Sequence, residues 1–267
     1  MTNLELPAST STPAPKIGII DLLALTFAFA LVFGVYESIP PKMISPNPTI
    51  PLWYVLFRAN LIIPLALWIT WLFVIIREAI NSKKLVRHPG YLLILQSGMA
   101  ALLSLAILFS FGQLAKFMNI DGSNWGSNNV FHMTYIFCTS IQYLIVIVAS
   151  SIGVFVFPRW WWKIAFALNV LLHLSYGLST AVIGVFLVVD SWEFFGWLDI
   201  ISGVSSFLLY AFSIWLFVCA AIEIRSKVSR NWLHWCGVIG TIVFGCINGL
   251  LWWISQIVLT PEQIFGR

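Results

Sequence analysis

Long apolar stretches separated by short polar or basic connections divide this chain into seven segments, near residues 17–36, 52–76, 91–114, 130–157, 164–189, 200–224 and 233–259. A helix that crosses the roughly 30 Å hydrocarbon core of a bilayer needs about 20 apolar residues, and each stretch reaches that length. Short connections favour antiparallel neighbours. The pattern therefore predicts an all-α integral membrane protein, a seven-transmembrane-helix bundle.

The flanking segments lack this pattern. Residues 1–16 are rich in Ser, Thr and Pro and are expected to form a disordered polar N-terminal tail, while residues 260–267 form a short C-terminal tail. The predicted transmembrane domain is then 17–259. No charged segment precedes the first span and no clear small-residue cleavage site follows it, so we expect a retained helix and not a cleaved signal peptide.

The composition agrees with a membrane protein, because 60% of the residues are hydrophobic and 9% are charged. Soluble domains are about half apolar and a quarter charged, so too few ionic groups exist here to solvate a closed surface. The formal net charge of +4 comes from short basic runs between spans, which indicate bilayer orientation and not nucleic-acid binding. The expected partners are the lipid bilayer and possible further membrane subunits.

Basic residues divide unequally between the two predicted faces, ten against four. The richer face is expected in the cytoplasm of a plasma or inner membrane, which places the N-terminus inside and the C-terminus outside. The ten are Lys16, Arg77, Lys83, Lys84, Arg87, Arg159, Lys163, Arg225, Lys227 and Arg230, and the four are Lys42, Arg58, Lys116 and Arg267. Tryptophans near span ends, including Trp160 to Trp162, are interpreted as an aromatic belt at headgroup level.

Few motifs indicate chemistry. The seventh span has no Lys for a retinal Schiff base, no HExxH is present, and the four cysteines lie in apolar segments without a CxxC pair. The segment 203–206 resembles the GxSG motif of rhomboid proteases but lacks its final Gly, and Ser205 and His234 are expected at opposite membrane faces. Asp21 is expected to reach water at the inner face.

Histidines at unmatched depths disfavour a bis-histidine haem, although a single-ligand haem or a quinone contact at His173 stays open. We therefore expect no catalytic residue, no metal ligand and no cofactor, and predict that the protein is not an enzyme.

Polar residues recur at helical spacing in the last four spans. The stripes are His132, Tyr135, Thr139 and Gln142, then Asn169, His173, Tyr176 and Thr180, then Ser202, Ser206, Tyr210 and Ser213, and finally Thr241, Gly245, Asn248 and Ser255. Lipid cannot satisfy polar atoms, so the stripes are expected to face one another. Counting inward from the span ends predicts a midplane polar cluster of Gln142, Asn169, His173, Tyr176, Tyr210, Ser213 and Asn248.

Two interpretations of this cluster compete. In the first, the side chains are interhelical hydrogen-bond glue, and the chain is a noncatalytic accessory or scaffold subunit of a membrane assembly. In the second, they line a small polar pocket or pathway between spans four and seven, and the chain is a transporter or channel for a small uncharged or weakly polar solute. A membrane redox or intramembrane enzyme subunit is a third hypothesis. No charge or discontinuous helix marks the cluster, so the sequence favours glue.

Overall fold

The computed structural model describes residues 18–38, 51–82, 88–117, 129–189, 194–228, 230 and 232–258. The regular elements within these ranges are seven α-helices, so the all-α prediction is confirmed. They are α1 (Ile19–Ser38), α3 (Pro51–Ser82), α4 (Pro89–Phe117), α5 (Asn129–Val156), α6 (Trp160–Val189), α7 (Phe194–Arg225) and α8 (Trp232–Val258). The two predicted tails lie outside the described residues.

The helices have the length and composition of membrane spans. Within the described residues, α1 and α3 to α7 each carry an apolar stretch long enough to cross a bilayer, and α8 carries a shorter one, Trp232–Ile247. Large apolar side chains, among them Phe27, Phe155, Phe207 and Phe217, are exposed on the outer surface. A soluble protein seldom exposes so many large apolar side chains, whereas lipid accommodates them. The chain is therefore a polytopic membrane helix bundle.

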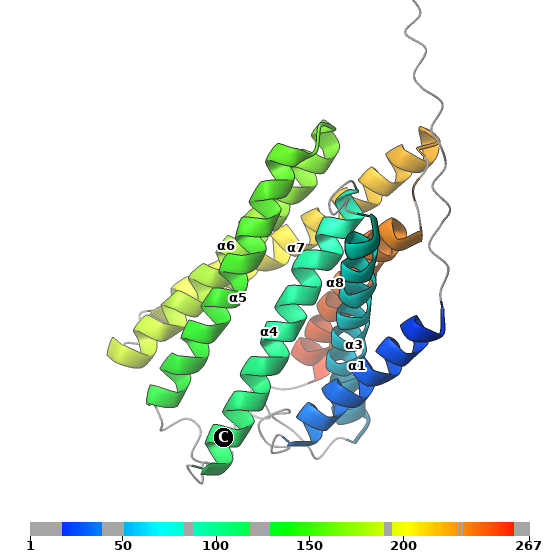
Figure 1. Ribbon diagram of the computed structural model, residues 1–267. Coiled ribbons are helices and arrows are strands. Elements are labelled where there is room, and N and C mark those ends of the chain that lie inside the picture. Colours follow the sequence, from blue (N-terminus) through cyan, green and yellow to red (C-terminus); the bar gives the residue numbers. More distant parts are fainter. Residues whose placement is uncertain are drawn as a thin grey trace, which may run out of the picture.

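Six helices form a closed ring. Each of α3 to α8 packs against the next in chain order, and α8 returns to contact both α3 and α4. Helix α1 lies outside this ring against α3 and α4 (Figure 1). The α5–α6 hairpin stands beside α4 in the same view. This arrangement leaves an interior that all six ring helices can reach.

One end of the bundle holds the start of α1 and the end of α3 together. The backbone N–H of Gly18 donates to the carboxylate of Asp21, which caps the first turn of α1, and the other carboxylate oxygen pairs with Arg77 on α3. Asp21 is buried, so the expectation that it reaches water is wrong. Burial is tolerated because both carboxylate oxygens have a partner.

Two glycines let α4 and α8 touch at this same end, which we call the inner end after its predicted orientation. A Cβ atom added at Gly90 would overlap the backbone carbonyl of His234, and one added at Gly237 would overlap that of Gly90. Backbones approach this closely only where no side chain intervenes. The contact between α4 and α8 therefore depends on glycine at both positions.

Candidate functional site

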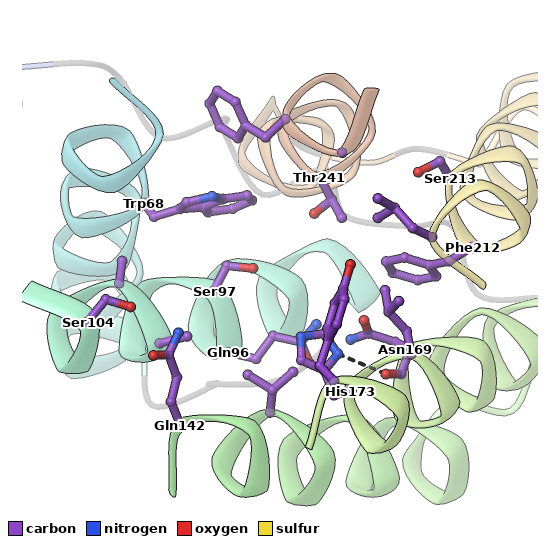
Figure 2. A pocket seen from close by; sticks show the side chains of 18 of the residues that line it. Trp68, Gln96, Ser97, Ser104, Gln142, Asn169, His173, Phe212, Ser213 and Thr241 are labelled. Atoms are coloured by element: carbon purple, nitrogen blue, oxygen red, sulfur yellow. Dashed lines mark hydrogen bonds between the residues drawn. The ribbon is translucent and has the colours of Figure 1, made fainter. Parts of the chain in front are cut away.

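A cavity of about 420 Å³ lies inside the ring, lined by residues of all six ring helices. Figure 2 shows α8 and Trp68 of α3 on one side of this space, and α5 and α6 on the other. Thr241 of α8 is four residues beyond Gly237, so the close α4–α8 contact lies about one turn from the cavity. The contact between α4 and α8 thus lies next to the cavity, on the side of the inner end.

The lining is polar but carries no ionised side chain. Apolar residues such as Trp68, Leu172, Phe212 and Phe244 make up about half of it. The polar members are Gln96, Ser97, Ser104, Gln142, Asn169, His173, Tyr176, Ser213 and Thr241. Amides, hydroxyls and one imidazole can form hydrogen bonds without an ion's desolvation cost. The cavity therefore suits an uncharged occupant.

Five of the seven residues in the predicted midplane cluster border this cavity. They are Gln142, Asn169, His173, Tyr176 and Ser213. The side chain of Asn248 lies outside the described part of the chain. Gln142 of the α5 stripe and Asn169, His173 and Tyr176 of the α6 stripe thus border one space, whereas Tyr135 of the α5 stripe is exposed. Helix α4 adds three polar residues that sequence reasoning missed, although a Gln-Ser pair inside an otherwise apolar span was a usable signal.

Tyr210 does not join the cavity and is 45% exposed on the outside of α7. The inward face of α7 carries Ser205, Phe212 and Leu216 instead, all buried. The predicted stripe through Ser202, Ser206 and Tyr210 is offset from that inward face by one position in the sequence, as Ser206 is from Ser205. One residue is about 100° around a helix, which is enough to turn a side chain from interior to lipid.

Part of the cluster is interhelical glue. The Asn169 amide donates to the Ser150 hydroxyl at 2.8 Å, and that hydroxyl donates to the Gln96 side-chain oxygen at 2.8 Å. This chain of bonds joins α6, α5 and α4, and all three residues are buried. A second bond, 2.9 Å between the hydroxyls of Ser205 and Ser175, joins α7 to α6. Ser205, from the protease-like segment, therefore serves packing.

His173 presents a hydrogen-bond acceptor beside the cavity. Its Nδ1 lies 2.9 Å from the Asn169 carbonyl oxygen, and because a carbonyl only accepts, Nδ1 must carry the proton. In the neutral ring Nε2 is then an acceptor, and no described residue hydrogen-bonds to it. Ring contacts with Tyr143 at 6.2 Å and Tyr176 at 6.0 Å hold the imidazole in place.

Other lining groups are also unpaired. Among the described residues, none hydrogen-bonds to the side chains of Ser97, Ser104, Gln142 or Ser213. A polar group that faces neither water nor a partner costs a few kcal/mol. Water or a polar solute in the cavity would supply the missing partners.

A second polar centre lies at the inner end, around Glu223 of α7, and sequence reasoning missed it. Glu223 is 0% exposed. Arg230 donates from Nε to both carboxylate oxygens at 3.2 Å, and Trp162 of α6 donates from its indole N–H at 3.0 Å. Arg159 is 3.6 Å away. A buried carboxylate is stable here because every side of it faces a donor or a cation.

Trp162 departs from the aromatic-belt interpretation. It is 1% exposed, whereas its neighbour Trp160 is 57% exposed. The three consecutive tryptophans occupy successive positions around the first turn of α6, so only Trp162 points inward to Glu223. The belt interpretation fits Trp160 but not Trp162.

His234 of α8 completes the Glu223 centre. Its Nε2 lies 3.0 Å from a Glu223 oxygen, and its Nδ1 accepts the backbone N–H of Gly90 at 3.0 Å. Since Nδ1 accepts, the proton of the neutral ring is on Nε2, facing the carboxylate. Arg230 also contacts His88 at 2.8 Å. The centre joins α4, α6, α7 and α8. The Glu223 carboxylate already has hydrogen-bond partners on three other residues, so its role is structural.

Comparisons of the chain with protein-family models, with curated proteins and with solved structures find no match. No group of three His, Cys, Asp or Glu side chains placed to hold a metal ion occurs among the described residues. The function is therefore inferred from the chemistry of the cavity.

Proposed function

We propose that this protein binds a small uncharged solute in the cavity at the centre of its helix ring, as a carrier or binding protein of the membrane. The observation that carries the proposal is the set of unpaired polar groups around this space, Ser97, Ser104, Gln142, Ser213 and Nε2 of His173. Its volume of about 420 Å³ falls in the range of small-molecule sites, roughly 300–1,000 Å³.

The proposal replaces the accessory-subunit hypothesis as the leading one. A bundle that served packing alone would be expected to pair its interior polar groups, as Gln96, Ser150 and Asn169 do. The proposed function does not include catalysis. The titratable lining residues are His173 and Tyr176, and neither touches a carboxylate, a second imidazole or a thiol among the described residues.

The proposed topology has seven spans, with the N-terminus in the cytoplasm and the C-terminus outside, in a plasma or inner membrane. The basic-residue asymmetry supports this orientation. The pairing of Asp21 with Arg77, and of Gly90 with His234, supports the predicted alternation of helix directions, because each pair joins helix ends predicted on the same face.

Thiol labelling tests whether the interior is an open cavity. Single cysteines are introduced as Ser97→Cys or Ser213→Cys into a background without Cys138, Cys219, Cys236 and Cys246. In lipid nanodiscs a small neutral thiol reagent should modify both sites. The matched control is Ser150→Cys, because Ser150 is 0% exposed and lies packed between α4 and α6. A cysteine at this position should stay unmodified. If all three sites are inert while the protein remains folded, the interior is dry and the proposal is wrong.

A further inference from the structure

We infer that the ligand of this cavity is a neutral aromatic molecule carrying a hydroxyl or N–H donor, of the phenol or hydroquinone class, and that this donor binds Nε2 of His173. The inference rests on the proposed function, because it names the chemistry of the solute for the same cavity. Three features of the lining carry it: the absence of ionised groups, the fixed imidazole and the aromatic wall.

Neutrality follows from the lining residues. None of them is Asp, Glu, Lys or Arg. Glu223, the buried carboxylate of the inner end, already faces Arg230, Trp162 and His234 and is not part of the lining. An ion moved into the cavity would lose its hydration without gaining a counter-charge, which strongly disfavours charged ligands.

The need for a donor follows from the state of His173. Its Nδ1–H is held by the Asn169 carbonyl, four residues earlier on the same helix, so the ring cannot change tautomer without losing that bond. Nε2 therefore offers a lone pair beside the cavity. Hydroxyls at Ser97, Ser104 and Ser213 adapt to either a donor or an acceptor, whereas this nitrogen of the neutral ring only accepts. A ligand must bring an O–H or N–H to satisfy it.

The aromatic preference comes from the wall that α3, α7 and α8 provide. Trp68 and Phe244 meet edge to face with ring centroids 5.7 Å apart, and Phe212 lines the same space. Figure 2 shows Trp68 across the space from His173. A flat ring can contact these aromatic faces while its polar substituent reaches the amides, hydroxyls and imidazole opposite.

Three probe molecules separate these requirements. Hydroquinone has a ring and donors, 1,4-dimethoxybenzene has the ring without donors, and cyclohexane-1,4-diol has donors without the ring. Binding to the protein in nanodiscs is measured by saturation-transfer NMR, with empty nanodiscs to subtract partitioning into lipid. Hydroquinone should bind about tenfold more tightly than 1,4-dimethoxybenzene, the scale of one buried hydrogen bond, and also more tightly than cyclohexane-1,4-diol, which lacks the flat ring.

Two substitutions of His173 separate binding from folding. The amide nitrogen of Asn can take the place of Nδ1, so His173→Asn should keep the bond to the Asn169 carbonyl and the melting temperature, yet lose about tenfold in hydroquinone affinity. His173→Gln places an amide oxygen near the position of Nε2 and should retain more affinity. Tyr210→Phe, on the exposed face of α7, is the matched control and should change neither quantity.

The outcomes distinguish the inference from the function that it rests on. Equal binding of hydroquinone and dimethoxybenzene, or full affinity in the folded His173→Asn variant, would overturn the donor requirement. Tight binding of the cyclohexanediol would overturn the aromatic requirement. In both cases the cavity still binds neutral solutes. Failure of all three probes, together with unmodified cysteines at Ser97 and Ser213, would overturn the proposed function itself.

Discussion

His234 on α8 accepts a 3.0 Å hydrogen bond through its Nδ1 from the backbone N–H of Gly90 on α4. The same ring faces Glu223 of α7 through Nε2. One imidazole therefore sets the spacing of three helices at the inner end. Thr241, seven residues further along α8, lines the cavity about two turns away. The contact at Gly90 thus positions the helix that forms one wall of the proposed binding site.

Removing the Glu223 charge should destabilise the protein severely. In Glu223→Gln the guanidinium of Arg230, whose side chain is 11% exposed, loses its counter-charge. Breaking one side of a buried ion pair costs about 3–5 kcal/mol. The melting temperature in detergent should fall strongly, whereas Asp199→Asn, at an exposed position of the same helix, should leave it within experimental error.

The double substitution Glu223→Gln with Arg230→Gln provides a further check. It should lose less stability than Glu223→Gln alone, because no unpaired charge remains buried. A double variant that melts below both single variants would contradict this account of the centre.

Alanine at Gly90 or Gly237 should force α4 and α8 apart. Each added Cβ would overlap backbone atoms of the other helix, which cannot rotate away as a side chain would. We expect a loss of about 1–3 kcal/mol or more and a lower melting temperature. Gly177→Ala and Gly203→Ala, where no atom lies within 4 Å of the added Cβ, are the controls. They should be neutral or up to about 1 kcal/mol more stable. Similar losses at all four glycines would contradict the close-approach explanation, because helix propensity alone favours alanine over glycine.

Glycine at Lys227 should stabilise the end of α7. Lys227 has a positive φ of 49°, and the N–H of Val228 bonds back to the Glu223 carbonyl at 3.1 Å, as in a Schellman motif. This left-handed conformation costs a residue with a Cβ about 1 kcal/mol, and glycine avoids the cost. Lys227→Gly should therefore raise the melting temperature. Lys227→Gln removes the same charge but keeps the Cβ, so an equal rise in that variant would refute the backbone explanation.

The glue function of Ser150 can be separated from ordinary helix packing. Ser150→Ala removes the bridge between Asn169 and Gln96 and should cost about 1–2 kcal/mol, the scale of an intramembrane hydrogen bond. Its neighbour Ser151 bonds only to the Ile147 carbonyl of its own helix among the described residues. Ser151→Ala should thus have little effect on thermal unfolding. Equal effects at both serines would argue against the interhelical bridge.

Reporter fusions test the orientation. A reporter placed after Lys84 or Lys227 should be cytoplasmic, and one at the C-terminus should be external, because the predicted spans place ten of the fourteen basic residues on the face of Lys84 and Lys227. An external signal after Lys84 would reverse the whole topology. A cytoplasmic signal at the C-terminus alone would mean an even number of spans.

Hydrophobic patterning alone was enough to predict an all-helical membrane bundle. Twenty or more apolar residues in succession leave few other structures, since a bilayer offers no partner for backbone N–H and C=O groups. Helical spacing also predicted that Gln142 on α5 and His173 on α6 would face the same interior, and both line the cavity. Residues at i, i+4 and i+7 share a face whatever the helix packs against, so this information is local.

What the sequence could not decide is how far each helix is rotated about its axis and which neighbour it meets. Tyr210 and Leu209 are adjacent in the chain, yet Leu209 lines the cavity and Tyr210 faces outward. Glu223 beside basic residues at a span end is typical of a solvated interface, and only the packing of α6 and α8 against α7 buries it. Rotation and partner choice depend on the summed contacts of all the helices, which no single stretch of residues contains.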